Sequence, residues 1–203
     1  MLHSEAVPGG TLALLKRLCA HPALDGFALV GGTSLALRFG HRISVDLDFF
    51  RPEKFDNKAL AAALAADFPF EITNDNSNGM MTFIEKVKVD FVTYPYPLLH
   101  PYETLEGVRM MSLPDVIAMK LGAISNRGAK KDFYDLHTLL KHVGLDKILH
   151  SYQRKFPRHD PLIPIRSMIY FEDAEETETP KTLVKTSWPK VKTEILNAVK
   201  PIL

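Results

Sequence analysis

The chain changes its hydrophobic spacing near the middle. In the first half, stretches in which apolar and polar residues alternate predict strands, and stretches with apolar residues at helical spacing predict helices. The polar segment "NDNSNG" between two predicted strands has the composition of a hairpin turn. This half is therefore expected to form a sheet, mostly a meander, with flanking helices. The predicted strands are residues 26–30, 42–50, 70–75, 80–85 and 87–94, and the predicted helices are residues 9–22, 33–39 and 57–68.

The second half is predicted to be mainly helical. Three prolines in residues 95–103 indicate a connection. After it, apolar residues recur at helical spacing in residues 112–124, 130–143, 145–156 and 187–203, with Ser187 as a candidate N-cap. We expect two parts, residues 1–97 with the sheet and residues 98–203 with the helices.

The predicted strand over residues 42–50 carries two aspartates on one face. Successive side chains of a strand point to opposite faces, so Asp46 and Asp48 would lie side by side, about 6.5–7 Å apart at Cα. Two carboxylates this close repel each other unless a cation lies between them, and hard divalent ions favour such oxygen ligands. The alternative is a solvated face whose acids pair with Arg42 or a lysine. The opposite face is apolar and expected in the core: Ile43, Val45, Leu47 and Phe49.

A later strand repeats the pattern. In "KVKVDFVTY", Lys88 and Asp90 lie on one face and apolar residues on the other. If the two strands pair, Asp90 completes a triad with Asp46 and Asp48, and three carboxylates can hold two metal ions. An isolated surface aspartate is the alternative.

The segment "VGGTS" ends a predicted strand and opens a helix. Glycine permits tight turns and the close approach of a phosphate. The first N–H groups of the helix, with the hydroxyl of Thr33 or Ser34, would form an anion site at Gly31 and Gly32. Thr33 could equally be an N-cap alone.

Two charged residues interrupt the apolar stripes of the later helices. Lys120 lies in the middle of one stripe and Asp132 inside the next, where each needs a partner of opposite charge. A buried salt bridge of Asp132 with Lys120 or Arg127 would explain both without catalysis. The alternative is contact with a triphosphate, to which Arg127 and Lys131 of the basic loop would add phosphate contacts.

Composition excludes some classes of protein. The 203 residues are 46% hydrophobic and 24% charged with net charge +1, which is ordinary for a globular protein. No signal peptide or membrane-spanning stretch is expected, and the one cysteine, Cys19, cannot form an intramolecular disulfide. The histidines lack zinc spacing, and aromatic residues do not interleave with basic ones along the chain as in a nucleic-acid stacking platform.

The order of three motifs resembles the nucleotidyltransferase superfamily that includes DNA polymerase beta. These are a hydrophobic residue before Gly-Gly, then Asp-hydrophobic-Asp-hydrophobic, then a distant hydrophobic-Asp-hydrophobic. The fuller pattern, with Lys-x-Asp, a Ser eight residues before a Lys, and Lys-Asp-x-x-Asp, is similar to the AbiEii/AbiGii family of toxins from type IV toxin–antitoxin systems. The matching residues are 30–32, 46–49, 88–91, Ser112 with Lys120, and 131–135, within residues 25–143.

The resemblance implies a fold and a set of site residues. The fold would be α+β, a polymerase-beta-like nucleotidyltransferase core with a mixed sheet in residues 1–97, and a mainly helical region, residues 98–203, that completes the nucleotide cleft. Two Mg²⁺ ions, or Mn²⁺, would bind Asp46, Asp48 and Asp90. The implied catalytic residues are Asp46, Asp48, Asp90, Lys120 and Asp132. The implied nucleotide-binding residues are Gly31, Gly32, Thr33, Ser34, Lys88, Arg127 and Lys131.

The resemblance also implies an activity and partners. A nucleotidyl group would pass from a nucleoside triphosphate to an RNA, for some relatives tRNA, or to a protein, with release of pyrophosphate. The protein would be a cytoplasmic toxin with a cognate antitoxin and without a membrane partner. Two alternatives stay open: a non-catalytic module of the same fold that binds a nucleotide or partner, and an antibiotic-type enzyme with a small-molecule acceptor.

Overall fold

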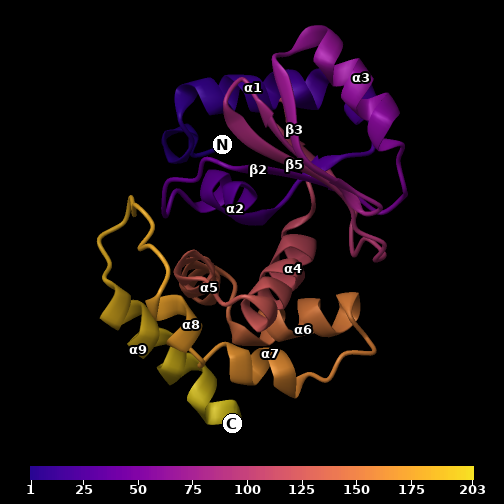
Figure 1. Cartoon of the computed structure of the whole chain (residues 1–203). Coiled ribbons are helices and arrows are strands. Elements are labelled where there is room, and N and C mark those ends of the chain that lie inside the picture. The colour runs from indigo at the N-terminus through magenta and orange to yellow at the C-terminus, as the bar shows by residue number, and fades with distance from the viewer.

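A seven-stranded mixed sheet lies between two groups of helices in the computed structural model, which describes residues 1–203 (Figure 1). The strand order is β3-β4-β5-β2-β1-β7-β6. The mixed sheet followed by a helical region confirms the predicted fold class. The strands are β1 (Ala28–Leu29), β2 (Leu47–Arg51), β3 (Phe70–Asn76), β4 (Gly79–Ile84), β5 (Val87–Thr93), β6 (Glu103–Leu105) and β7 (Val108–Met110).

The centre of the sheet brings together segments far apart in the sequence. Strands β3, β4 and β5 form the predicted antiparallel meander, whereas β2 pairs with β5 in parallel. On its other side β2 is antiparallel to β1, which is in turn parallel to β7. The register places Asp48 directly opposite Asp90.

Strand β2 is shorter than the predicted strand over residues 42–50. It begins at Leu47, and of the four apolar residues expected in the core only Leu47 and Phe49 are buried, while Val45 is 52% exposed. The preceding segment is held by other partners, because Ile43 N–H donates to the Lys181 carbonyl and Ser44 N–H to the Ala6 carbonyl. These contacts draw residues 42–46 away from the sheet.

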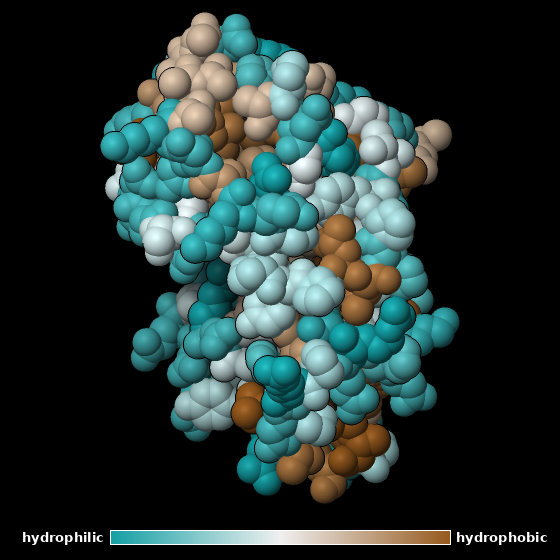
Figure 2. Space-filling view, turned by 90° about the vertical axis from the view of Figure 1, so that its right-hand side faces the viewer, coloured by the Kyte–Doolittle hydropathy of each residue, from teal (hydrophilic) through white to brown (hydrophobic).

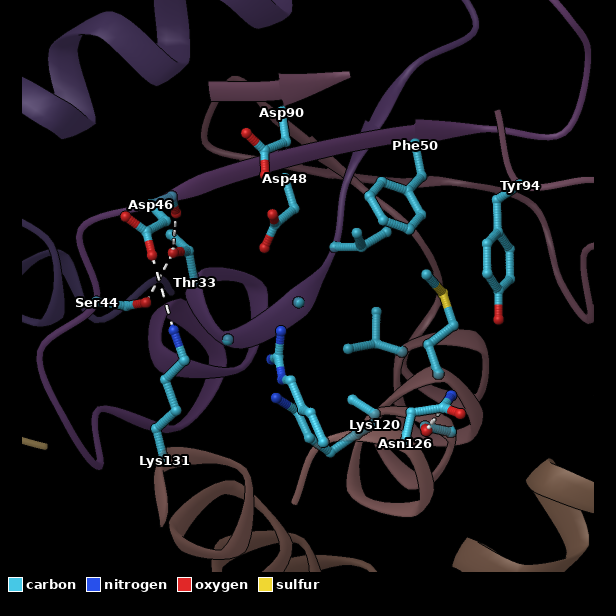
Figure 3. Close-up of a pocket in the computed structure, with 18 of the residues that line it drawn as sticks. Thr33, Ser44, Asp46, Asp48, Phe50, Asp90, Tyr94, Lys120, Asn126 and Lys131 are labelled. Carbon is cyan, nitrogen blue, oxygen red and sulfur yellow. Dashed lines mark hydrogen bonds and ion pairs between the residues drawn. The ribbon is translucent and has the colours of Figure 1, made fainter. Parts of the chain in front are cut away.

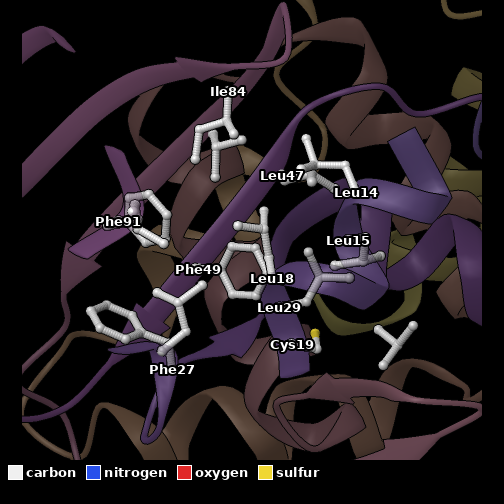
Figure 4. Close-up of a cluster of buried hydrophobic side chains, with 14 of the residues drawn as sticks. Leu14, Leu15, Leu18, Cys19, Phe27, Leu29, Leu47, Phe49, Ile84 and Phe91 are labelled. Carbon is white, nitrogen blue, oxygen red and sulfur yellow. The ribbon is translucent and has the colours of Figure 1, made fainter. Parts of the chain in front are cut away.

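The helices of the first half lie on both sides of the sheet, with the second of them on the side of the C-terminal helices (Figure 1). They are α1 (Gly9–Ala20), α2 (Gly31–Phe39) and α3 (Asn57–Asp67), with short 3-10 turns at Ser4–Ala6 and Pro22–Leu24. Figure 4 shows leucines of α1 lying against Leu29, Phe49 and Phe91 of three neighbouring strands. Cys19 is buried in the same cluster.

A second core belongs to the C-terminal helices. They are α4 (Leu113–Asn126), α5 (Lys130–His142), α6 (Leu145–Lys155), α7 (Leu162–Ser167), α8 (Glu172–Glu175) and α9 (Trp188–Val199), followed by a 3-10 turn at Lys200–Ile202. The short helices α7 and α8 were not predicted. Ser187 does precede α9, but its side chain makes no capping hydrogen bond.

Strands β6 and β7 were also not predicted, and both come after residue 97. The expected division between residues 1–97 and 98–203 therefore runs through the sheet, and the helices begin at Leu113. No helix combines the length and the apolar composition needed to cross a bilayer. Figure 2 shows one face of the molecule as mostly hydrophilic, with apolar side chains gathered in separate patches.

A fully buried ion pair fixes the connection between the sheet and the helices. Lys155 Nζ lies 2.6 Å from Asp115 Oδ1 and donates to the Pro97 carbonyl. The Asp115 carboxylate also accepts the backbone N–H groups of Leu99 and His100. The two side chains thus satisfy the backbone of residues 97–100, which lies outside any strand or helix.

Replacing this lysine should destabilise the protein strongly. In Lys155→Met the Asp115 carboxylate stays buried without its cation, which typically costs about 3–5 kcal/mol. Urea unfolding measures the change, with Lys147→Met, an exposed position of the same helix, as control within about 0.5 kcal/mol of wild type. Equal stability of the two variants would contradict the assigned role of the pair.

Candidate active site

A pocket of about 320 Å³ opens between the sheet and the C-terminal helices (Figure 3). The start of α2 and strands β2 and β5 form one wall, and α4 with the loop before α5 forms the other. Ten of the twelve site residues expected from the sequence line it: Gly31, Gly32, Thr33, Asp46, Asp48, Lys88, Asp90, Lys120, Arg127 and Lys131.

Two carboxylates lie side by side on the parallel strands. Asp48 and Asp90 are register partners, and Lys88 Nζ donates to Asp90 Oδ2 at 2.9 Å. The other oxygen, Asp90 Oδ1, is buried without a hydrogen-bond partner. Burial, and then the charge of Asp90, raise the pKa of Asp48. This pair therefore has unsatisfied demand for a cation or a hydrogen-bond donor.

Asp46 stands apart from that pair. It precedes β2, its side chain is 38% exposed, and Lys131 Nζ lies 3.8 Å away. No three His, Cys, Asp or Glu side chains converge into a ready metal site, so the three aspartates line the pocket without forming a closed triad. Figure 3 shows all three carboxylates on the sheet side of the pocket, with Lys120 and Lys131 across from them.

The two glycines have different reasons to be glycine. Gly31 has a φ of +69°, and a Cβ there would overlap the Asp48 carboxylate. A Cβ on Gly32 would overlap the Arg42 guanidinium. Side chains of the protein thus fill the space next to both glycines, where a phosphate was expected to approach. The phosphate-facing groups that remain are the backbone N–H groups of the α2 N-terminus.

Contrary to expectation, neither hydroxyl near this helix start offers a free donor to an anion in the pocket. Thr33 is not an N-cap: its hydroxyl bonds to the Ser44 hydroxyl at 2.8 Å and to the Asp46 carbonyl, which fixes the segment before β2. Ser34 is fully buried, its hydroxyl has no partner, and it does not line the pocket.

Behind the pocket, one buried carboxylate collects three donors. Asp135 is paired with Arg42 through two hydrogen bonds of 2.7 and 3.0 Å, with His41 Nε2 at 2.7 Å and with Lys120 Nζ at 2.7 Å. Burial alone would raise the pKa of Asp135, but Arg42 and Lys120 outweigh it and hold that pKa well below its ordinary value. Asp135 is therefore an anion throughout the physiological range.

Asp132, one turn earlier on α5, extends this network. It contacts Lys120 Nζ at 2.8 Å and Arg127 Nε at 2.9 Å, and these cations outweigh burial and lower its pKa. The salt bridge considered from the sequence is present with both partners. Asp132 is fully buried and does not line the pocket, so it can reach a ligand only through Lys120 and Arg127.

Three members of the site were not predicted from the sequence: His41, Arg42 and Asp135. Arg42 was weighed only as a partner of the aspartates near it. The available signal was the spacing of Asp132 and Asp135, which puts both on one helix face. Asp135 was quoted within the Lys-Asp-x-x-Asp motif without a role.

The far end of the pocket is apolar. Val30, Phe50, Val116 and Met119 line it, together with the ring of Tyr94 (Figure 3). Charged groups at one end and apolar groups at the other match a ligand that has a polyanionic end and a flat apolar end.

Comparisons with known proteins agree with this fold. The nucleotidyltransferase toxin MenT4 of Mycobacterium tuberculosis H37Rv shares the fold with a TM-score of 0.63 and 16% identity, over 98% of this chain and 86% of that one. JHP933 from Helicobacter pylori shares it with a TM-score of 0.56 and 17% identity, over 97% and 93%. The protein is a nucleotidyltransferase with a polymerase-beta-like fold.

The sequence places it within one family. The model of the family described as "Nucleotidyl transferase AbiEii toxin, Type IV TA system" matches residues 13–201, and the chain belongs to this family. An uncharacterized protein of Aquifex aeolicus (strain VF5) is 34% identical over 168 residues, which cover 80% of this chain and 82% of that protein. The resemblance noted in the sequence is confirmed.

The raised pKa of Asp48 predicts that Asp48→Asn stabilises the fold at pH 7. A folded-state pKa above the unfolded value means that stability falls as the pH rises through the folded-state pKa. A neutral amide of the same shape removes that cost, so the gain should shrink toward zero as the pH falls to about 4, where the unfolded carboxyl protonates.

Urea unfolding at both pH values tests this, with the exposed Asp67→Asn as control. Loss of stability in Asp48→Asn at pH 7 would contradict an uncompensated charge at this position.

Proposed function

We propose that the protein transfers a nucleotidyl group from a nucleoside triphosphate to an acceptor hydroxyl and releases pyrophosphate. The observation that carries the proposal is the pair Asp48 and Asp90. Asp90 has an unpartnered carboxylate oxygen, the pKa of Asp48 is raised, and both residues lie in one pocket with a helix N-terminus and several cations.

The triphosphate is proposed to bind at the charged end. The N-terminus of α2 offers free N–H groups and the positive end of the helix dipole. Lys120, Arg127 and Lys131 line the same region. Arg42 lines the pocket as well, and the three cations Arg42, Lys120 and Arg127 are paired with only two buried carboxylates, so the network keeps a positive surplus for an anion.

The apolar end suits the base. Phe50 and Tyr94 offer ring faces, and Met119 adds a deformable apolar side chain to the lining of the same pocket. The nucleotide would then span the pocket with its α-phosphate beside the aspartates. None of the apolar lining groups reads a particular base, so this wall favours no one nucleotide.

Divalent ions fit the donor set at the aspartates. Asp48 and Asp90 would hold Mg²⁺ or Mn²⁺, with Asp46 on the same side of the pocket as a further oxygen ligand, since hard oxygen ligands and an unsatisfied carboxylate are what such ions require. When bound, the ions supply neutralisation of phosphate charge and activation of the attacking oxygen.

Asp90 is the proposed proton acceptor. Lys88 occupies Oδ2 and orients the group, which leaves Oδ1 free to take the proton of the acceptor hydroxyl. The acceptor oxygen then forms its bond to the α-phosphorus while the bond to the pyrophosphate oxygen breaks. Lys120, held by Asp132 and Asp135, faces the leaving charge.

The description of the family as a toxin of a type IV toxin–antitoxin system supports a cognate antitoxin as the partner that limits toxicity. RNA is the proposed acceptor, as the resemblance of the motifs implies. Because the pocket carries no group that excludes a small-molecule hydroxyl, the acceptor has to be found by experiment. Incubation with each labelled triphosphate, with and without total RNA, identifies both substrates. EDTA should abolish the transfer, and Mg²⁺ or Mn²⁺ should restore it.

Asp90→Asn should abolish most of the transfer while the protein stays folded. Loss of a general base lowers the rate by about 10²–10⁴-fold, and the amide can still accept from Lys88. Pyrophosphate release and incorporation of the labelled nucleotide measure the rate, and circular dichroism checks the fold. The surface variant Asp67→Asn should keep full activity, and a wild-type rate in Asp90→Asn would refute the assignment.

A further inference from the structure

One ion pair links the two walls of the pocket. Lys131, on the first turn of α5, places its Nζ 3.8 Å from Oδ2 of Asp46, which precedes β2 (Figure 3). Other lysines of the pocket pair differently, because Lys88 lies on the same strand as its partner Asp90, and the carboxylates paired with Lys120 are buried behind the wall. The contact between Lys131 and Asp46 therefore joins the helical side to the group of aspartates.

This contact is easily broken. The side chain of Lys131 is 45% exposed and that of Asp46 38% exposed, and 3.8 Å exceeds the length of a hydrogen bond. By contrast, Lys120 Nζ lies 2.8 Å from Asp132 Oδ1, and both of those side chains are buried. An exposed ion pair of this kind contributes little to stability, so stability does not explain its position across the pocket.

The backbone of Lys131 is fixed, whereas its ammonium can move. The preceding residue, Lys130, donates its N–H to the Thr177 hydroxyl at 2.8 Å, and the next residue, Asp132, is anchored by Lys120. A long, exposed lysine side chain on a fixed backbone changes rotamer readily. The ammonium can therefore exchange one partner for another without a movement of α5.

The two ligands of the proposed reaction compete for the two members of this pair. Asp46 is a proposed oxygen ligand of the divalent ion, and Lys131 lines the charged end of the pocket, where the triphosphate is proposed to bind. An ammonium next to a carboxylate lowers the affinity of that carboxylate for a second cation, because the two cations repel each other. A triphosphate next to Lys131 would draw the ammonium away and remove this competition.

We propose that Lys131 couples the binding of the triphosphate to the binding of the divalent ion. It pairs with Asp46 until a triphosphate binds, then turns to the phosphates and leaves the Asp46 oxygens to the ion. The inference rests on the proposed function and assigns Lys131 as a positioning residue of that site. Because coupling between two ligands is reciprocal, each ligand then binds more tightly when the other is present.

Lys131→Met tests the proposal, because it should change the affinities for the two ligands in opposite directions. Binding of Mn²⁺ alone is measured by electron paramagnetic resonance at low ionic strength, and it should become about three- to fivefold tighter, which corresponds to the strength of an exposed ion pair. Binding of inorganic triphosphate in the presence of EDTA is measured by calorimetry, and it should become weaker by a similar factor. A general disturbance of the pocket would weaken both.

Two control variants should bind Mn²⁺ as the wild type does. Lys131→Arg keeps a cation next to Asp46. Lys141→Met removes the same charge from the same helix, at a lysine that is 51% exposed and paired with Glu194 outside the pocket.

Unchanged or weaker Mn²⁺ binding in Lys131→Met overturns the proposal, and so does triphosphate binding that is not weakened. Equal tightening of Mn²⁺ binding in either control, or no Mn²⁺ binding by wild type and variant alike, also overturns it. The two proposals fail separately. Tighter Mn²⁺ binding in Lys131→Met, in a protein that transfers no nucleotide, refutes the reaction alone. Nucleotide transfer by the wild type with unchanged Mn²⁺ binding in Lys131→Met refutes the coupling alone.

Discussion

The buried carboxylate of Asp135 is the constraint on which the arrangement of the molecule depends. It lies on α5, and its donors come from the segment after α2 (His41 and Arg42) and from α4 (Lys120). An ion taken out of water is stable only when its partners are held in good geometry. The three elements therefore cannot move apart without leaving a charge unpaired. The pocket between the sheet and the helices owes its shape to this cluster.

The same cluster sets an electrostatic asymmetry across the pocket. On the helical side, cations exceed carboxylates, whereas on the sheet side Asp48 and Asp90 stand together with only Lys88 beside them. Neither surplus is neutralised within the protein. A ligand that brings phosphates to one side and divalent cations to the other would complement both, and this complementarity underlies the proposed function. The raised pKa of Asp48 shows that a charged carboxylate without a cation at this position lowers the stability of the folded protein.

The spacing of apolar residues predicted those parts of the structure that are set by neighbours in the sequence. The meander, the helices of the second half and the three aspartates follow from alternation and helical spacing, because burial of one face imposes these periods. The short strands β6 and β7 were not predicted, since their residues become a sheet edge only when β7 pairs with β1 and β6 pairs with β7. The strand predicted over residues 42–50 was too long, because its first residues bond to Ala6 and Lys181 and not to the sheet. No periodicity in the sequence reveals these contacts.

Contacts between residues far apart in the sequence also limited the prediction of the site. The odd positions of Lys120 and Asp132 signalled buried charge, yet Arg42 looked like an ordinary strand residue until Asp135, 93 residues later, was found beside it. The two glycines were assigned correctly to a tight place, but what presses on them is Asp48 and Arg42. In each case the missing information is the identity of a distant neighbour. A second cavity is the extreme example, since the aromatic residues that line it come from two segments more than fifty residues apart in the sequence: Tyr94, Tyr96, Tyr152, Phe156 and His159.

The retention of so many buried charges bears on function in its own right. Replacing a buried ion cluster by well-packed apolar residues is often neutral or stabilising, so stability alone does not explain Arg42, Lys120, Asp132 and Asp135. The cluster forms part of the pocket wall, since its three cations, Arg42, Lys120 and Arg127, line the pocket while both carboxylates are buried behind them. Asp132 and Asp135 thus act as positioning groups. They hold the cations close together at the pocket wall, where the cations would otherwise repel one another. A polyanionic ligand such as a triphosphate is what makes that arrangement favourable, and this argument is independent of the family to which the chain belongs.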